Sequence, residues 1–113
     1  MAQRITIIQG HPDPAGTRFC HALAEAYAAG ARESGFEVNL VDVAHLDFPV
    51  LRTQAEFEMG TPPQPIIDAQ EAIRWADHLV IIYPLWGGMM PALLKAFFEQ
   101  AFRPGFALKT GGC

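Results

Sequence analysis

The stretch GHPDPAGTRF at residues 10–19 combines an imidazole, a hydroxyl and a guanidinium directly before a predicted helix. The first turn of a helix has free backbone N–H groups and the positive end of the helix dipole, which together attract an anion. Thr17 can cap that helix and donate to a phosphate, His11 can donate to the same group, and Arg18 can add charge. The alternative is a polar turn that Thr17 caps, with His11 simply exposed.

A second stretch, PLWGGMMP at residues 84–91, is suited to a flat ligand. Gly87 and Gly88 allow backbone angles that are closed to other residues, and they let the main chain approach a ring closely. Trp86 offers a large aromatic face, and free backbone N–H groups can bind the polar edge of a heteroaromatic ring. The alternative places Trp86 in the core and leaves the glycines to turn the chain.

Hydrophobic patterns around these loops predict alternating strands and helices. The predicted elements, in chain order, are a strand at 4–9, a helix from a Thr17 cap to Gly35, a strand at 36–43, a helix at 66–76, a strand at 78–84 and a helix after Pro91. The first helix has an apolar residue at every fourth position, at Phe19, Leu23, Tyr27 and Ala31. This order predicts a single α/β domain over residues 1–113, with a parallel sheet.

Topology decides whether the two loops can act together. In an open parallel sheet, ligands bind beyond the C-terminal ends of the strands, where the strand order reverses. With the strand order 2-1-3, the reversal lies between the first and third strands, and the loops that carry His11 and Trp86 become neighbours. We therefore expect one ligand site formed by both loops.

Two features disturb the expected pattern. Residues 44–65 form a long, proline-rich connection, which predicts a functional or mobile segment beside the open face of the site or at a dimer contact. The strand at 78–84 is apolar almost throughout, which is typical of a strand covered on both faces. Its outer edge, however, has no fourth strand to cover it, so the chain looks cut short.

The composition excludes several classes of function. The net charge is −4 with acids and bases interspersed, which argues against a nucleic-acid surface. No segment approaches the roughly 18 uninterrupted apolar residues of a membrane span. The first residues lack the apolar region of a secretory signal, so a cytoplasmic protein without membrane insertion is expected. Cys20 and Cys113 are then expected to be free thiols.

Other chemistries find little support in the sequence. A metal site from His11, Asp13 and His21 lacks an established ligand spacing, so no metal is expected. Cys20 as a nucleophile lacks a positioned base and is expected to be buried. A phosphoacceptor domain needs an aspartate at the end of the third strand, where Tyr83 stands. Neither the dinucleotide fingerprint GxGxxG nor a P-loop is present.

The stretches GHPDPAGTRF and WADHLVIIYPLWGGMMPALLKAFFEQAF resemble the flavodoxin-like NAD(P)H dehydrogenase (quinone) family, and the resemblance covers nearly the whole chain. That family includes quinone reductases, the modulator of drug activity B type and the ancillary oxidoreductases of potassium efflux systems. The resemblance implies a three-layer α/β/α fold around a five-stranded parallel sheet, of which the fourth and fifth strands are missing here. It also implies FAD or FMN as cofactor, NAD(P)H as electron donor, a quinone as acceptor, and a homodimer.

By motif, the resemblance assigns binding roles to residues of both loops. The residues implied to hold the flavin phosphates are His11, Thr17, Arg18, Phe19 and Cys20. Those implied to line the isoalloxazine ring are Pro84, Leu85, Trp86 and Gly87. Catalysis then rests on the flavin, with no catalytic acid or base in the protein.

Three departures from the family pattern bear on this transfer. Many relatives have an asparagine where Cys20 stands, so the contact with phosphate is expected to be poorer here. Many have a second aromatic residue where Gly87 stands, which predicts a more open nicotinamide or quinone pocket here. Thr110, Gly111 and Gly112 imitate a flavin-site loop of the family, but they follow a helix with no strand between.

The predicted function is flavin-dependent NAD(P)H:quinone oxidoreductase activity, by two-electron hydride transfer. Two alternatives stay open: a regulatory subunit that docks on a transporter, and a shortened flavodoxin-like chain without activity. Retained oxidation of NAD(P)H separates the first interpretation from the others. Co-purification with a membrane partner favours the regulatory subunit that docks on a transporter.

Overall fold

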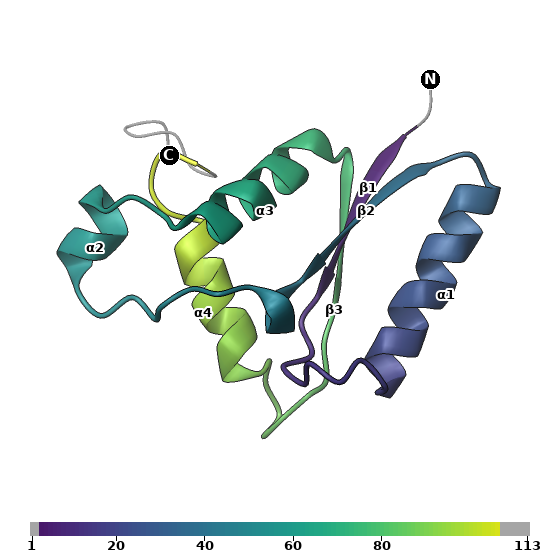
Figure 1. Cartoon of the computed structure of the whole chain (residues 1–113), viewed down its shortest axis with the longest axis horizontal. Coiled ribbons are helices and arrows are strands. Elements are labelled where there is room, and N and C mark those ends of the chain that lie inside the picture. Colours follow the sequence, from purple (N-terminus) through teal and green to yellow (C-terminus); the bar gives the residue numbers. More distant parts are fainter. Residues whose placement is uncertain (1–2, 107–113) are drawn as a thin grey trace.

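The computed structural model describes residues 3–106, which contain a parallel sheet of three strands (Figure 1). The strands are β1 (Arg4–Gln9), β2 (Glu37–Asp42) and β3 (His78–Ile82). Their order is β2-β1-β3, and Gln9 at the end of β1 lies opposite both Asp42 and Ile82. The predicted α/β class and strand order are therefore confirmed.

Helices cover both faces of the sheet (Figure 1). They are α1 (Phe19–Glu33) on one face, and α3 (Gln64–Trp75) and α4 (Ala92–Ala101) on the other. Successive side chains of a strand point to opposite faces, so Ile8 packs with residues of α3 and α4, whereas Ile7 packs with residues of α1. Both isoleucines are fully buried, which stabilises the fold by about 1.5–3 kcal/mol for each side chain.

The start of α1 differs from the prediction. Arg18 is the N-cap residue, so the predicted cap at Thr17 is wrong, and Thr17 is exposed just ahead of the helix. The backbone N–H of Arg18 donates to Nδ1 of His21 at 3.2 Å. An imidazole thus takes the place of the carboxylate that usually accepts this bond at a helix start, and it moves the helix start by one residue.

The buried face of α1 consists mainly of small residues, while three of the four members of the apolar series noted in the sequence lie outward. Cys20, His21, Ala24 and Ala31 are buried, whereas Phe19 is 78%, Leu23 44% and Tyr27 40% exposed. Small side chains let a helix lie close to a sheet, and the rotation of the helix about its axis follows from that contact. Periodicity alone does not determine this rotation.

The connection over residues 44–65 is partly helical. The 3-10 helix η1 (Val43–His45) follows β2, and α2 (Gln54–Met59) begins after Thr53, whose hydroxyl accepts from the N–H of Glu56. Gln100 at the end of α4 donates to the carbonyl of Pro49 at 2.7 Å. Arg103 donates to the carbonyl of Glu56 at 2.6 Å. Two buried polar side chains therefore hold this segment against the end of α4.

The third strand is less covered than its apolar sequence predicts. β3 is an edge strand of the described sheet, Ile82 is its one buried residue, and Ile81 is 42% exposed. The predicted exposed edge of this strand is confirmed, and the predicted cover on both faces is wrong. The physical reason is that β1 is its one neighbour among the described residues, so side chains near the other edge lack packing partners.

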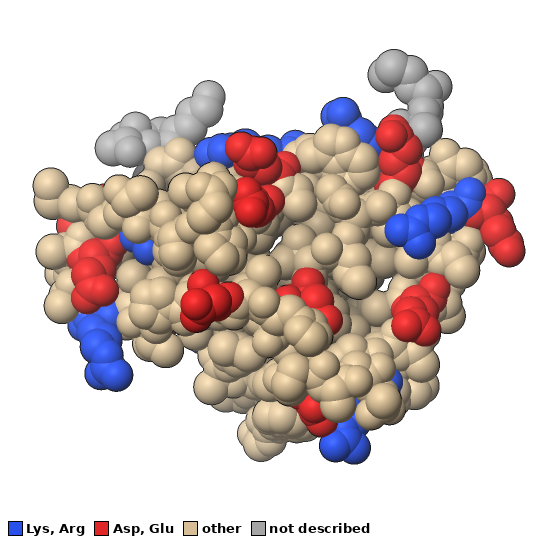
Figure 2. Space-filling model, in the orientation of Figure 1, with Lys and Arg blue, Asp and Glu red and all other residues tan. Residues whose placement is uncertain are grey.

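Charged side chains are spread over the surface. On the face drawn in Figure 2, acidic and basic residues are mixed, and no basic stripe is visible. Within residues 3–106, no helix combines the length and the apolar content that crossing a membrane requires.

Candidate functional site

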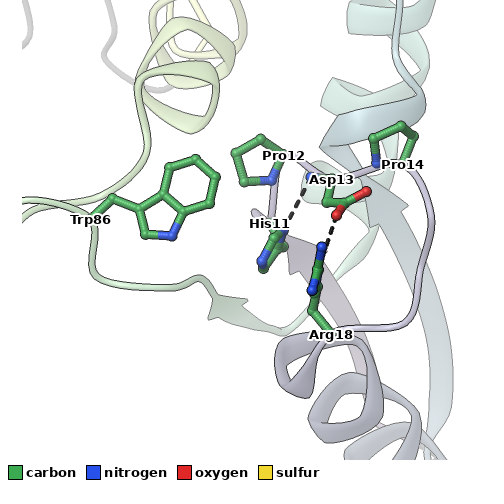
Figure 3. Close-up of a pocket in the computed structure, with 6 residues that line it drawn as sticks. All are labelled: His11, Pro12, Asp13, Pro14, Arg18 and Trp86. Carbon is green, nitrogen blue, oxygen red and sulfur yellow. Dashed lines mark hydrogen bonds and ion pairs between the residues drawn. The ribbon is translucent and has the colours of Figure 1, made fainter.

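The loops that follow β1 and β3 meet beyond the C-terminal ends of these strands. They border an open cleft of about 580 Å³ (Figure 3). The side chains that line it are His11, Pro12, Asp13, Pro14, Arg18 and Trp86. The predicted adjacency of the two loops is confirmed, and the cleft lies where strand order reverses, the usual ligand position in an open parallel sheet.

Gln9, which the sequence analysis passed over, ties the first loop to α1. Its side chain is 2% exposed, its amide nitrogen donates to the carbonyl of Cys20 at 2.8 Å, and its amide oxygen accepts from the N–H of His11 at 3.1 Å. A polar residue at the end of a buried strand was the available signal. Gln9 therefore determines how the chain leaves β1 and where His11 begins the cleft.

Gly10 allows the close packing behind this turn. A Cβ atom at Gly10 would lie 2.7 Å from Cδ2 of Leu94 and 3.1 Å from Cβ of Tyr83. The N–H of Gly10 also donates to the carbonyl of Ile82 at 2.7 Å. Glycine thus lets the ends of β1, β3 and α4 approach one another at the base of the site.

His11 is a buried imidazole at the floor of the cleft. Its Nδ1 accepts from the backbone N–H of Asp13 at 3.1 Å, so the neutral ring carries its proton on Nε2. Burial and the neighbouring His21 lower the pKa of His11, Asp13 opposes this shift, and Arg18 adds to it. The side chain is therefore favoured as a neutral hydrogen-bond donor.

Asp13 and Arg18 form an ion pair across the mouth of the first loop (Figure 3). Nε of Arg18 donates to Oδ2 of Asp13 at 3.0 Å, and the N–H of Ala15 donates to Oδ1 at 2.9 Å. The bond from Ala15, followed by that from Arg18, holds the pKa of Asp13 below its usual value. The carboxylate thus offsets part of the positive charge that Arg18 brings to the cleft.

The second loop is a tight turn that presents Trp86. Gly87 and Gly88 have φ angles of 63° and 79°, a region that favours glycine. Trp86 and Met89 exchange backbone hydrogen bonds of 2.9 and 3.2 Å across this turn. The indole is 52% exposed, so it forms a wall of the cleft and is not part of the core. The unusual backbone angles predicted for the two glycines are confirmed, and the alternative that places Trp86 in the core is wrong.

The structure brings three of the predicted site residues to the cleft: His11, Arg18 and Trp86. Thr17 and Phe19 are exposed beside it at the start of α1, and Leu85 and Gly87 are exposed on the second loop, with Pro84 half-buried before them. Pro12, Asp13 and Pro14 also line the cleft and were not predicted as residues of the ligand site. Asp13 was weighed only as a metal ligand, and the course of the loop brings it to the cleft.

Cys20 lies in the core and not in the cleft. Its side chain packs with Ile5, Ile7 and Ala24, and burial raises the pKa of its thiol. Cys20 is a free thiol, as predicted. Cys20 can therefore contribute only its backbone N–H to a ligand. Cys113 and the sequence Thr110-Gly111-Gly112 lie outside the described residues.

The first turn of α1 has unused donors beside the cleft. Among the described residues, no hydrogen bond uses the backbone N–H of Phe19 or Cys20. These groups, the guanidinium of Arg18 and Nε2–H of His11 can together hold a phosphate. Residues 3–106 bring together no group of three or more metal-ligating side chains.

An open parallel α/β sheet with helices on both faces and a cleft at the reversal of strand order is a doubly wound α/β fold. The chain belongs to the flavodoxin-like fold family, whose family model matches residues 3–112. The resemblance seen in the sequence is thereby confirmed at the level of the family.

Named relatives and one solved structure agree with this family. The chain is 30% identical over 107 residues to an uncharacterized NAD(P)H oxidoreductase of Haemophilus influenzae, covering 92% of this chain and 52% of that protein. It is 31% identical over 117 residues to an FMN-dependent NADH:quinone oxidoreductase of Nitratidesulfovibrio vulgaris, covering 88% and 56%. The structure of an NAD(P)H:quinone oxidoreductase from Methanothermobacter marburgensis superposes with a TM-score of 0.75 at 29% identity, covering 91% and 55%. This chain spans about half the length of these proteins.

The residues present fit a phosphorylated, planar cofactor. The first loop supplies the unused N–H donors of Phe19 and Cys20, and the second supplies the exposed indole of Trp86. The cleft volume of about 580 Å³ lies within the range of roughly 300–1,000 Å³ that is typical of cofactor sites. A flavin nucleotide combines these two chemical features in one molecule.

Proposed function

We propose that this chain binds a flavin nucleotide in the cleft and acts in a flavin-dependent NAD(P)H:quinone oxidoreductase. When bound, a flavin supplies two-electron hydride transfer from NAD(P)H and then to a quinone. The observation that carries the proposal is the convergence of a phosphate-type loop and an aromatic loop, with the His11 and Trp86 ring centroids 5.5 Å apart. The proposal is further supported by two similar proteins that are named as quinone oxidoreductases.

The protein residues have binding and orienting roles in this proposal. The start of α1 and His11 hold phosphate, since they offer neutral and charged donors at the positive end of a helix. Trp86 limits where a planar ring can lie, and its loop shields one side of that ring from water. No side chain is assigned as a catalytic acid or base.

Cofactor and assembly belong to the same proposal. The cofactor is FMN or FAD, and FMN is the first to test because one relative is named as FMN-dependent. The electron donor is NADH or NADPH. We further propose that the protein is a homodimer and that it is cytoplasmic. The support for the dimer is an exposed apolar loop tip, formed by Leu85, Trp86 and Met89, which a second copy of the chain can cover.

A titration of the purified chain with FMN and then FAD tests this proposal, with flavin fluorescence as the signal and the oligomeric state measured in the same sample. Saturable binding at micromolar or tighter dissociation constants is expected, followed by oxidation of NADH or NADPH with a quinone. A folded chain that binds neither flavin contradicts the proposal. Binding without turnover would keep the cofactor site and remove the enzyme claim for this chain.

A further inference from the structure

His21 has a buried hydrogen-bond donor without a partner next to the cleft. Its side chain is 8% exposed, and Nε2 makes no hydrogen bond within the described residues. The ring centroid lies 5.2 Å from that of His11, which lines the cleft. A buried N–H without an acceptor is destabilising, so an external acceptor would be favoured at this position.

The hydrogen bonds of the two imidazoles determine where their protons lie. Nδ1 of His21 accepts from the N–H of Arg18, and Nδ1 of His11 accepts from the N–H of Asp13. A ring nitrogen that accepts has no proton, so both neutral rings carry theirs on Nε2. Neither Nε2 can accept from the other ring. The pair therefore presents two donors and no acceptor.

Nearby protein acceptors do not meet this need. Asp13 supplies the one carboxylate that lines the cleft, and its two oxygens already accept from Arg18 and from the N–H of Ala15. The first turn of α1 adds further donors, the N–H groups of Phe19 and Cys20. Donors outnumber acceptors around the start of α1, as is typical of anion sites.

We infer that His21 is a second imidazole donor of this site and, with His11, binds the oxygens of a phosphate group. Its Nδ1 bond to Arg18 keeps the ring in place and the proton on Nε2. Because Nε2 is buried, a phosphate oxygen reaches it only after the His11 ring or the first loop shifts, and the inference includes that shift. It rests on the proposed function in so far as the phosphate belongs to a flavin nucleotide.

Two variants separate the donor of His21 from its role at the helix start. In His21→Asn, the side-chain oxygen can replace Nδ1 as acceptor for Arg18, and nothing replaces Nε2–H. In His21→Gln, the amide oxygen can accept from the N–H of Arg18, as a glutamine does at this position of a capping box, and the amide nitrogen can replace Nε2–H. We expect His21→Asn to keep the melting temperature and to bind FMN roughly tenfold or more weakly. His21→Gln should also keep the melting temperature and should retain more of the FMN affinity than His21→Asn.

The direct measurement is two-bond ¹H–¹⁵N NMR of the imidazoles in the whole chain, in a buffer without phosphate, before and after addition of FMN or of inorganic phosphate. Both ligands are expected to shift the Nε2 resonances of His21 and His11. A chain that binds FMN with unchanged His21 signals, and with equal affinity in His21→Asn, overturns the inference while the proposed function stands. If phosphate shifts His21 but FMN does not bind, the anion site stands and the flavin proposal fails. If neither ligand changes His21, the inference is wrong.

Discussion

Trp86 lies edge-on to His11, with ring centroids 5.5 Å apart and ring planes at 84°. His11 follows β1 and Trp86 follows β3, so this contact exists because the two strands are neighbours in the sheet. An edge-to-face arrangement is favourable for aromatic rings. The contact also places the indole wall of the cleft at a defined position relative to the first loop, residues 10–19.

Replacing the indole tests the second loop. Trp86→Ala is expected to weaken FMN binding about two- to tenfold, because ring contacts of this kind contribute about 0.5–1.5 kcal/mol. The melting temperature should change little, since the side chain is 52% exposed. Leu85→Ala is the matched comparison, because Leu85 is 71% exposed on the same loop and does not line the cleft, although the resemblance assigns it to the ring. Equal losses of affinity in both variants would show that the loop contributes shape and not the aromatic ring.

The Asp13–Arg18 pair predicts opposite effects for its two members. Asp13→Asn should strengthen phosphate or FMN binding about two- to fivefold, because it removes a carboxylate and frees Arg18. Arg18→Gln should weaken binding by a similar factor. The effects are modest because the side chain of Arg18 is 59% exposed, and such charges are screened by water and salt. Binding isotherms at low and high NaCl check this, and changes of the same sign in both variants would contradict it.

The lowered pKa of His11 predicts how stability depends on pH. Between the lowered value and the usual 6.5, the unfolded chain binds more protons than the folded chain, so the free energy of unfolding falls as pH drops. This contribution is fully present above 6.5 and is lost as pH falls through the folded-state pKa. Burial is the main cause, with His21, Asp13 and Arg18 as the charged or titratable groups that also act on the ring.

His11→Asn is the variant that checks this pH dependence. The amide does not titrate, and its oxygen can still accept from the N–H of Asp13. Urea unfolding between about pH 5 and pH 8 should give a smaller fall in stability for the variant than for the native chain. Asp13 does not interfere in this range, because its pKa is lowered from 3.8. A native slope that the variant reproduces in full would assign the effect to other groups.

Arg103 predicts how the 44–65 segment is held. Its guanidinium is buried and donates to the carbonyls of Gln100 and Glu56 and to the side chain of Gln100. Arg103→Met removes the donor to both oxygens of Gln100 and leaves the carbonyl of Glu56 with the N–H of Gly60 alone, so it should lower the free energy of unfolding by about 2–3 kcal/mol. Limited proteolysis should then cut within residues 44–65. Arg52→Met is the control, since Arg52 is exposed in that segment, and comparable cleavage in both variants would refute the role of Arg103.

The kinds of elements and their order were predictable from local patterns. The strand at 4–9, the three main helices and the position of the turn at Gly87 and Gly88 all appear close to where the sequence places them. Such patterns depend on neighbours along the chain, through side-chain alternation in strands and the helical repeat. The α/β class and the strand order followed from these elements and general rules of topology.

The composition of the site was only partly predictable. His11, Arg18 and Trp86 were predicted to bind the ligand, and they line the cleft. The resemblance assigned Cys20 to the ligand, whereas its residue type predicted a buried cysteine, and the burial is confirmed, because α1 is rotated so that this side chain enters the core. That rotation depends on which residues let the helix approach the sheet most closely, a property of the whole interface.

The sequence by itself determined that this chain is an α/β protein with two ligand-type loops after its first and third strands. Only the tertiary structure decided the pairing of Asp13 with Arg18, the bond from Arg18 to His21 and the unpartnered donor of His21. The physical reason is that hydrogen bonds require distances within a few tenths of an ångström. Those distances follow from the packing of loops and helices against the sheet, which no local stretch of sequence encodes.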